Sequence, residues 1–173
     1  MYDERLEEYD SLKAKYCTSA VEYGNEIFYL DEWNGGKVKT CSMELADIQS
    51  LFDFDIIDQD FSRLSVNRRY IALTRESNMA LLVFDRIAFC IKHCKLQFKP
   101  VDIRFYFENN ILVVSKAEGL VVNYKVNNFD NLVELWRYYI HGACNVCTDV
   151  NGYIFVGSSE KRVIHVLSPF GKT

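Results

Sequence analysis

The 173-residue chain has little of what marks disordered, fibrous or membrane-spanning proteins. It holds only two prolines and eight glycines, and 49% of its residues are hydrophobic, which excludes a disordered or collagen-like chain. Its longest apolar runs, such as 79–84 and 111–114, are far shorter than the roughly 18 to 20 residues that a membrane-spanning helix needs. The composition therefore predicts a soluble globular protein.

Basic residues are not in excess either. The chain has 20 Lys and Arg residues against 24 Asp and Glu residues, which gives a formal net charge of −4. Because phosphate backbones and anionic lipids attract basic surfaces, neither general nucleic-acid binding nor membrane binding is expected. The chain begins MYDERLEEYD, which is acidic where an export signal is basic and then apolar. We therefore expect the protein in the cytoplasm, with the nucleus as the alternative.

Six cysteines and three histidines offer thiolates and imidazoles, the ligands that zinc prefers. Without an export signal the thiols are expected to stay reduced, and their first role to be that of small buried hydrophobic side chains. Neither Cys/His cluster has the spacing of a zinc finger or ribbon. Metal binding is left open for the two clusters, Cys90, His93 and Cys94 in one and His141, Cys144 and Cys147 in the other. No cofactor, metal ligand or catalytic residue is assigned.

What the chain does have is a repeat. Four segments combine an apolar run, a short polar turn and a second apolar run, and they start 43, 41 and 42 residues apart, at 27, 70, 111 and 153. Tyr, Ile, Val and Phe fill the runs, whereas Gly, Asn, Ser and charged residues fill the turns, which is the pattern of a β-hairpin. A strand-like stretch precedes each hairpin, and another follows the first three. Each repeat therefore predicts four strands.

Four strands in about 42 residues match the spacing of a β-propeller blade. The chain resembles propeller repeats of the WD40 and NHL kind: NGYIFVGSSEKRVIHVLSPFGK at 151–172 is similar to an NHL blade, and Phe84 and Asp85 sit where WD40 blades carry a Trp-Asp pair. The other three blades lack that pair. We expect an all-β fold with about four four-stranded blades, at approximately 17–58, 59–100, 101–142 and 143–173.

Two other architectures share part of this pattern. A β-sandwich has short strands but does not repeat a two-run unit at a constant interval, and a helical solenoid needs a 3.6-residue periodicity that these runs lack. The segment 1–16 is expected to form either an N-terminal helix or a strand that closes the last blade. The blades would accordingly form a closed small ring or a segment of a larger propeller, and an open edge would allow self-association.

The predicted function is that of a non-catalytic scaffold that binds a protein partner through loops on one face of the blades. Trp33 is the main candidate contact, because an indole in a hairpin turn can act as a binding anchor. The other candidate contacts are charged residues in or beside the hairpin turns: Glu32, Arg75, Glu76, Lys116, Glu118, Lys161 and Arg162. Two alternatives stay open, a metal-dependent propeller hydrolase or lactonase and a fragment of a larger WD40-type or NHL-type adaptor.

Overall fold

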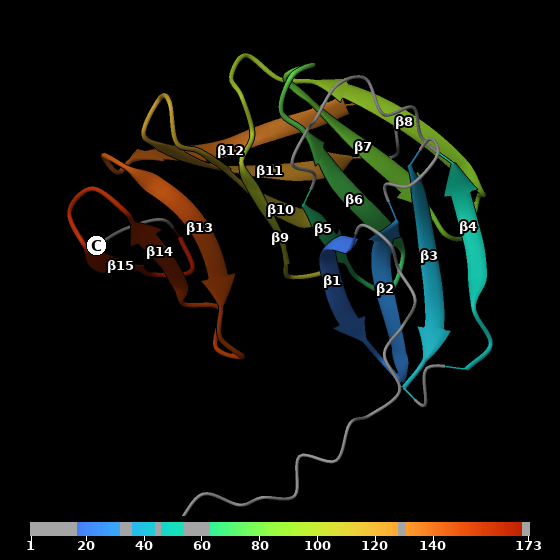
Figure 1. The fold of residues 1–173 in the computed structure, drawn as a ribbon. Helices are drawn as coiled ribbons and strands as arrows, with labels where there is room; N and C mark the ends of the chain where they lie inside the picture. The colour runs from blue at the N-terminus through green and yellow to red at the C-terminus, as the bar shows by residue number, and fades with distance from the viewer. Residues whose placement is uncertain (1–16, 32–35, 44–45, 54–62, 128–130, 171–173) are drawn as a thin grey trace, which may run out of the picture. The chain divides into compact units, whose positions relative to one another are not determined.

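A computed structural model describes residues 17–31, 36–43, 46–53, 63–127 and 131–170 (Figure 1). The regular structure of these ranges is entirely β, with fifteen strands. The helix or closing strand expected at 1–16 lies outside the described residues. Among the described residues, the structure has no helix with the length and apolar character needed to cross a membrane.

The strands form four antiparallel sheets in which the order along the chain is also the order in space. The first holds β1 (Cys17–Tyr23), β2 (Glu26–Asp31), β3 (Lys37–Ser42) and β4 (Gln49–Asp53), and the second β5 (Leu64–Val66), β6 (Tyr70–Arg75), β7 (Ala80–Asp85) and β8 (Cys90–Lys95). The third holds β9 (Asp102–Tyr106), β10 (Asn110–Ser115), β11 (Leu120–Asn127) and β12 (Asn131–Tyr139), and the fourth β13 (Ala143–Thr148), β14 (Ile154–Ser158) and β15 (Val163–Leu167). Such consecutive meanders are propeller blades, and the predicted fold class is confirmed.

In each of the last three blades, the turn between the second and third strands has the same backbone conformation. The residue just before the third strand has a positive φ in each: 47° at Met79, 60° at Gly119 and 55° at Arg162. Only Gly119 adopts this conformation without steric strain. The repeat is therefore a repeat of backbone conformation as well as of hydrophobic pattern.

The chain divides into two compact units, residues 1–56 and 57–173. The first unit contains the sheet β1 to β4, in which Phe28, Leu30 and Val38 are fully buried. The second unit contains the other three blades. Each unit has its own set of buried strand residues.

Within the second unit, each blade packs its face on the next blade. One buried cluster combines Ala72 of β6 with Val113 of β10, and another combines Leu112 of β10 with Val156 of β14. Leu112 and Val113 belong to different clusters because successive residues of a strand point to opposite faces. The middle blade is thus buried on both faces.

Three hydrogen bonds between side chains and backbone groups reinforce this packing between blades. The backbone N–H of Phe105 donates to Ser65 Oγ at 2.8 Å, and Asn67 Nδ2 donates to the Glu108 carbonyl at 2.7 Å. The backbone N–H of Val146 donates to Asp102 Oδ2 at 2.8 Å. Each bond joins one blade to the next.

Asp102 makes this bond at an electrostatic cost. Burial raises the pKa of the Asp102 carboxyl, and the N–H groups of Val146 and Ile103 offset only part of that effect. A carboxyl whose pKa is raised by folding stabilises the fold most below its unfolded value of about 3.9, and this contribution is lost as the pH rises through the folded pKa. At neutral pH, the charged Asp102 therefore lowers the stability of the fold.

We expect Asp102→Asn to raise the free energy of unfolding at pH 7 by about 1 kcal/mol. The amide oxygen still accepts from the Val146 N–H, whereas the buried charge is gone. Urea denaturation at pH 7 and pH 3.5 checks this, because the gain should disappear at the lower pH, where Asp102 of the wild type is protonated. Equal stability of the two proteins at pH 7 contradicts the prediction.

Candidate binding surface

The third strand of the last blade, β15, differs from its counterparts in exposure. The strand β7 is buried along its whole length, and β11 is buried over its first five residues. In β15, by contrast, Val163, Ile164 and Val166 are 46%, 70% and 49% exposed. The strands β8 and β12 cover the outer edges of β7 and β11, whereas no described strand pairs with the outer edge of β15. This edge presents β-branched apolar residues to solvent.

The open face of this blade continues from β15 across the sheet. The register places Ile164 beside Gly157 of β14, and Gly157 beside Asn145 of β13. At the equivalent position of the two preceding blades, the pair is Thr74 with Leu81 and Val114 with Val121, and all four are fully buried. In the last blade the same row is accessible.

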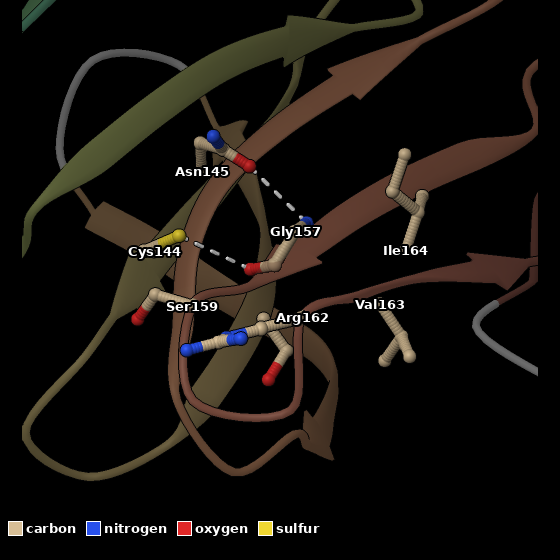
Figure 2. A pocket seen from close by; sticks show the side chains of 8 residues that line it. Cys144, Asn145, Gly157, Ser159, Arg162, Val163 and Ile164 are labelled. Carbon is tan, nitrogen blue, oxygen red and sulfur yellow. Dashed lines mark hydrogen bonds between the residues drawn. The ribbon is translucent and has the colours of Figure 1, made fainter.

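A shallow pocket of about 520 Å³ lies at this row, beside the turn that leads into β15 (Figure 2). Its lining comes from β13, β14, β15 and the turn between the last two: Cys144, Asn145, Gly157, Ser158, Ser159, Arg162, Val163 and Ile164.

Gly157 fixes the shape of the pocket floor. Its N–H donates to Asn145 Oδ1 at 3.2 Å, and its carbonyl accepts from the Cys144 thiol at 3.4 Å (Figure 2). The register between β13 and β14 shifts between Ala143 and Asn145, which brings both side chains onto one glycine. A Cβ atom at position 157 would lie 2.2 Å from Asn145 Oδ1, so any other residue would displace Asn145. Glycine at this position therefore lets the Asn145 side chain lie directly against the β14 backbone.

The polar groups of the pocket leave donors available. The hydroxyls of Ser158 and Ser159 donate to the carbonyls of His141 and Gly142. The Asn145 amide nitrogen and the Arg162 guanidinium make no hydrogen bond or ion pair with other described residues, and the lining contains no carboxylate. The pocket thus offers N–H donors and one positive charge beside apolar side chains. Such a surface suits a carboxylate attached to an apolar segment.

The turn that carries Arg162 contacts the connection between the third and fourth blades. His141 Nε2 lies 2.5 Å from Glu160 Oε2, and the Lys161 N–H donates to Ser158 Oγ at 3.2 Å. The Ser159 N–H also donates to the Gly142 carbonyl at 2.9 Å. These contacts hold the backbone at the start of β15.

The structure places the predicted contact residues in different surroundings. Glu32 and Trp33 lie outside the described residues. Arg75 ends β6 and is only 4% exposed, so it is part of the blade interior rather than of the turn surface, and Glu76 is half-buried. The others, Lys116, Glu118, Lys161 and Arg162, are exposed, and Glu118 accepts a hydrogen bond from the Ser115 hydroxyl. Of this set only Arg162 lines the pocket.

The cysteines are not all buried, contrary to the expectation. Cys41 is buried, whereas Cys17, Cys90 and Cys147 are exposed. Cys17 begins β1, Cys90 begins the outer strand β8, and Cys147 lies on β13 of the last blade. In the ranges that the structure describes, no group of three or more Cys, His, Asp or Glu side chains comes together in a way that could hold a metal ion.

Sequence reasoning missed Asn145 and Gly157, the residues that shape the pocket. A glycine inside the apolar run 154–158 was the available signal, since glycine within a strand often marks a bulge or a close approach. Its partner on β13 depends on the register shift. The sequence pattern does not show that shift.

Comparisons with known proteins identify the fold and no family. No family model and no curated protein sequence matches the chain. Among solved structures, the chain is similar to the glutaminyl cyclase of Myxococcus xanthus, with a TM-score of 0.59 and 9% identity over 87% of this chain and 65% of that one. It is similar to the computationally designed Ika4 protein, with a TM-score of 0.66 and 14% identity over 94% and 98% of the two chains.

A nidogen/laminin complex contains a third similar chain, with a TM-score of 0.65 and 12% identity over 84% of this chain and 56% of that one. The chain thus spans less than two thirds of the length of the cyclase and of the nidogen/laminin chain it matches. At such identities the likeness extends to the fold alone. By fold, the chain is a β-propeller with four blades.

Proposed function

We propose that this chain is a non-catalytic protein-interaction module that binds its partner through the exposed side of the last blade. One observation carries the proposal: β15 presents Val163, Ile164 and Val166 to solvent next to a pocket with a free guanidinium. Contiguous exposed apolar surface with a polar rim is typical of protein-binding sites. The exposed residues Lys161 and Arg162 directly precede β15 and supply such a polar rim in this proposal, and Lys116 and Glu118 lie in the corresponding turn of the preceding blade.

The similar solved structures are compatible with this role without deciding it. One is a complex and another is an enzyme, and propellers carry many unrelated functions. No observation on the described residues favours the metal-dependent hydrolase. The proposal therefore depends on the surface of this chain and not on its neighbours.

We further infer that the blades are of the WD40 or NHL kind and act within a larger adaptor. Asp85 supports the WD40 likeness, because it is fully buried at the end of β7 and binds the two N–H groups of the next turn. A larger adaptor is compatible with the coverage of 65% and 56% of two similar chains, whereas the Ika4 chain is covered over 98% of its length. In such a protein the blades would hold the binding surface rigid.

The proposal is tested by affinity capture from a cell extract with the full chain. The double variant Ile164→Lys/Val166→Lys is expected to lose the captured protein at least about tenfold, since two charges replace the apolar contact. The control variant Ile87→Lys/Phe89→Lys changes an apolar pair on another blade that is at least as exposed, at 71% and 80%. It should capture as much as the wild type.

Equal capture by the β15 variant and the wild type contradicts the proposal. Equal losses of captured protein in both variants contradict it as well, because they would show that capture depends on exposed apolar surface in general and not on β15. Thermal denaturation of all three proteins accompanies the assay, and the exposed positions predict unchanged folding.

A further inference from the structure

The two preceding blades show how a fourth strand attaches beside the turn residue with positive φ. The N–H of Leu96, just after β8, donates to the Met79 carbonyl at 2.7 Å. The N–H of Ile140, just after β12, donates to the Gly119 carbonyl at 2.7 Å. Leu96 and Ile140 are both buried, at 4% and 2% exposure. The same donor position is thus filled by a buried aliphatic residue in both blades.

Arg162 occupies the equivalent place in the last blade. It has the same positive φ and directly precedes β15, as Met79 and Gly119 precede β7 and β11. Its carbonyl accepts no hydrogen bond from the described residues, and its side chain lines the pocket. The backbone is therefore in the conformation that receives a fourth strand.

The edge of β15 also lacks the features that prevent strand pairing. Proteins protect free edges with lysine, proline, inward charges or bulges. The strand β15 has the sequence VIHVL, and its pairing with β14 is regular over all five residues. A regular apolar edge is a template for an added strand.

We propose that β15 binds an extended segment of a partner protein as the fourth strand of the last blade. The segment runs antiparallel to β15, as β8 runs to β7 and β12 to β11. An N–H of the segment donates to the Arg162 carbonyl, in the register that Leu96 and Ile140 define. This inference rests on the proposed function and specifies its mode of binding.

The residues of β15 define the chemistry of the segment. Apolar side chains are expected beside Ile164 and Val166, which share the open face of the sheet. A Leu or Ile is expected at the position that donates to the Arg162 carbonyl, as in the two complete blades. An acidic residue directly after it would lie near the Arg162 guanidinium and the exposed Lys161. The pocket lining itself contains no carboxylate that would compete for the guanidinium. The partner segment is therefore an alternating apolar strand that ends in an acidic residue.

The probe is a fluorescein-labelled, C-terminally amidated peptide Lys-Thr-Val-Thr-Val-Thr-Leu-Glu, titrated with the full chain in a fluorescence anisotropy assay. The two valines are placed beside Ile164 and Val166, and the leucine N–H is placed at the Arg162 carbonyl. We expect saturable binding, and protection of the outward-facing β15 amides from hydrogen exchange only when the peptide is present.

Three controls separate strand addition from general stickiness. N-methylation of the leucine removes one N–H from the peptide and leaves the protein unchanged, and it should weaken binding about tenfold. Arg162→Gly keeps the positive φ, as Gly119 does, and should weaken binding of the Glu peptide about three- to fivefold without affecting a peptide that ends in Gln. The Ile87→Lys/Phe89→Lys variant should bind the peptide like the wild type.

Several results overturn the proposal. One is equal affinity for the N-methylated peptide. Another is protection of the outward-facing β15 amides without peptide, since the edge would then be filled by the chain itself. A dimer in light scattering that Ile164→Lys/Val166→Lys abolishes would assign the edge to a second copy. If the extract capture depends on β15 but the peptide does not bind, the interaction module stands and strand addition is wrong.

Discussion

Replacing Tyr70 with alanine is expected to lower the free energy of unfolding by about 3–5 kcal/mol, the largest effect of a single substitution that we predict. Tyr70 begins β6 and is 1% exposed. Its ring stacks on that of Phe105, with the ring centroids 6.3 Å apart and the planes at 21°. Because Phe105 belongs to the next blade, the substitution leaves a cavity in the packing between two blades.

The loss of stability is expected to come from the side chain alone, because the Tyr70 N–H would still donate to Asn67 Oδ1, as it does at 2.6 Å in the wild type. Urea denaturation of Tyr70→Ala against the wild type measures the change. Phe170→Ala is the control, since Phe170 is 77% exposed and its removal should change stability by no more than about 0.5 kcal/mol. Comparable losses in the two variants would show that Tyr70 does not hold the blades together.

The blade pattern could be predicted because it is written in local sequence. The spacing of the four hairpins follows from turn residues and apolar runs that lie next to each other in the chain. The turn at 116–119 illustrates this: its glycine at 119 adopts a φ of 60°, which a glycine accommodates best. Local preference and tertiary packing agree at such positions.

The burial of side chains at the ends of the strands could not be predicted in the same way. Arg75 stands next to a polar turn in the sequence, yet it forms the last rung of the β6–β7 ladder, opposite Ala80, and is buried. A turn position alone does not say whether a long side chain folds back along the strand. The exposure of Ile164 could not be predicted either, because the apolar sequence of β15 resembles that of the buried strands.

The pocket depends on two contacts that link distant residues. Asn145 and Gly157 are twelve residues apart, and they meet because β13 and β14 shift register near Cys144. A bulge changes which side chains share a face, and its position is a property of the paired strands rather than of either sequence alone. The candidate site therefore becomes visible only in the folded blade.

Asp85 is the residue whose substitution should show the clearest dependence on pH. It is fully buried at the end of β7, where Oδ1 accepts from the N–H groups of Ile87 and Ala88 at 2.8 and 3.0 Å. Its Oδ2 lies 3.0 Å from Arg69 Nε. Burial acts to raise the pKa of this carboxyl, but the two N–H groups and the Arg69 guanidinium together hold the pKa below its usual value.

A depressed pKa means that the charged carboxyl stabilises the fold. The contribution is complete above the unfolded value of about 3.9 and is lost as the pH falls through the folded pKa. We expect Asp85→Ala to lower the free energy of unfolding by about 2–4 kcal/mol at pH 7, because two N–H groups lose their acceptor and Arg69 loses its partner.

Urea denaturation at pH 7 and at pH 3 separates the two contributions. The gap between the wild type and Asp85→Ala should narrow at pH 3, because the Asp85 carboxyl takes up a proton more readily in the unfolded chain than in the folded one. Asp85→Asn keeps an oxygen for the two N–H groups but carries no charge, so its loss at pH 7 should be smaller than that of the alanine variant and should shrink further at pH 3. A gap between wild type and Asp85→Ala that is the same at both pH values would show that the hydrogen bonds to the turn act without the charge.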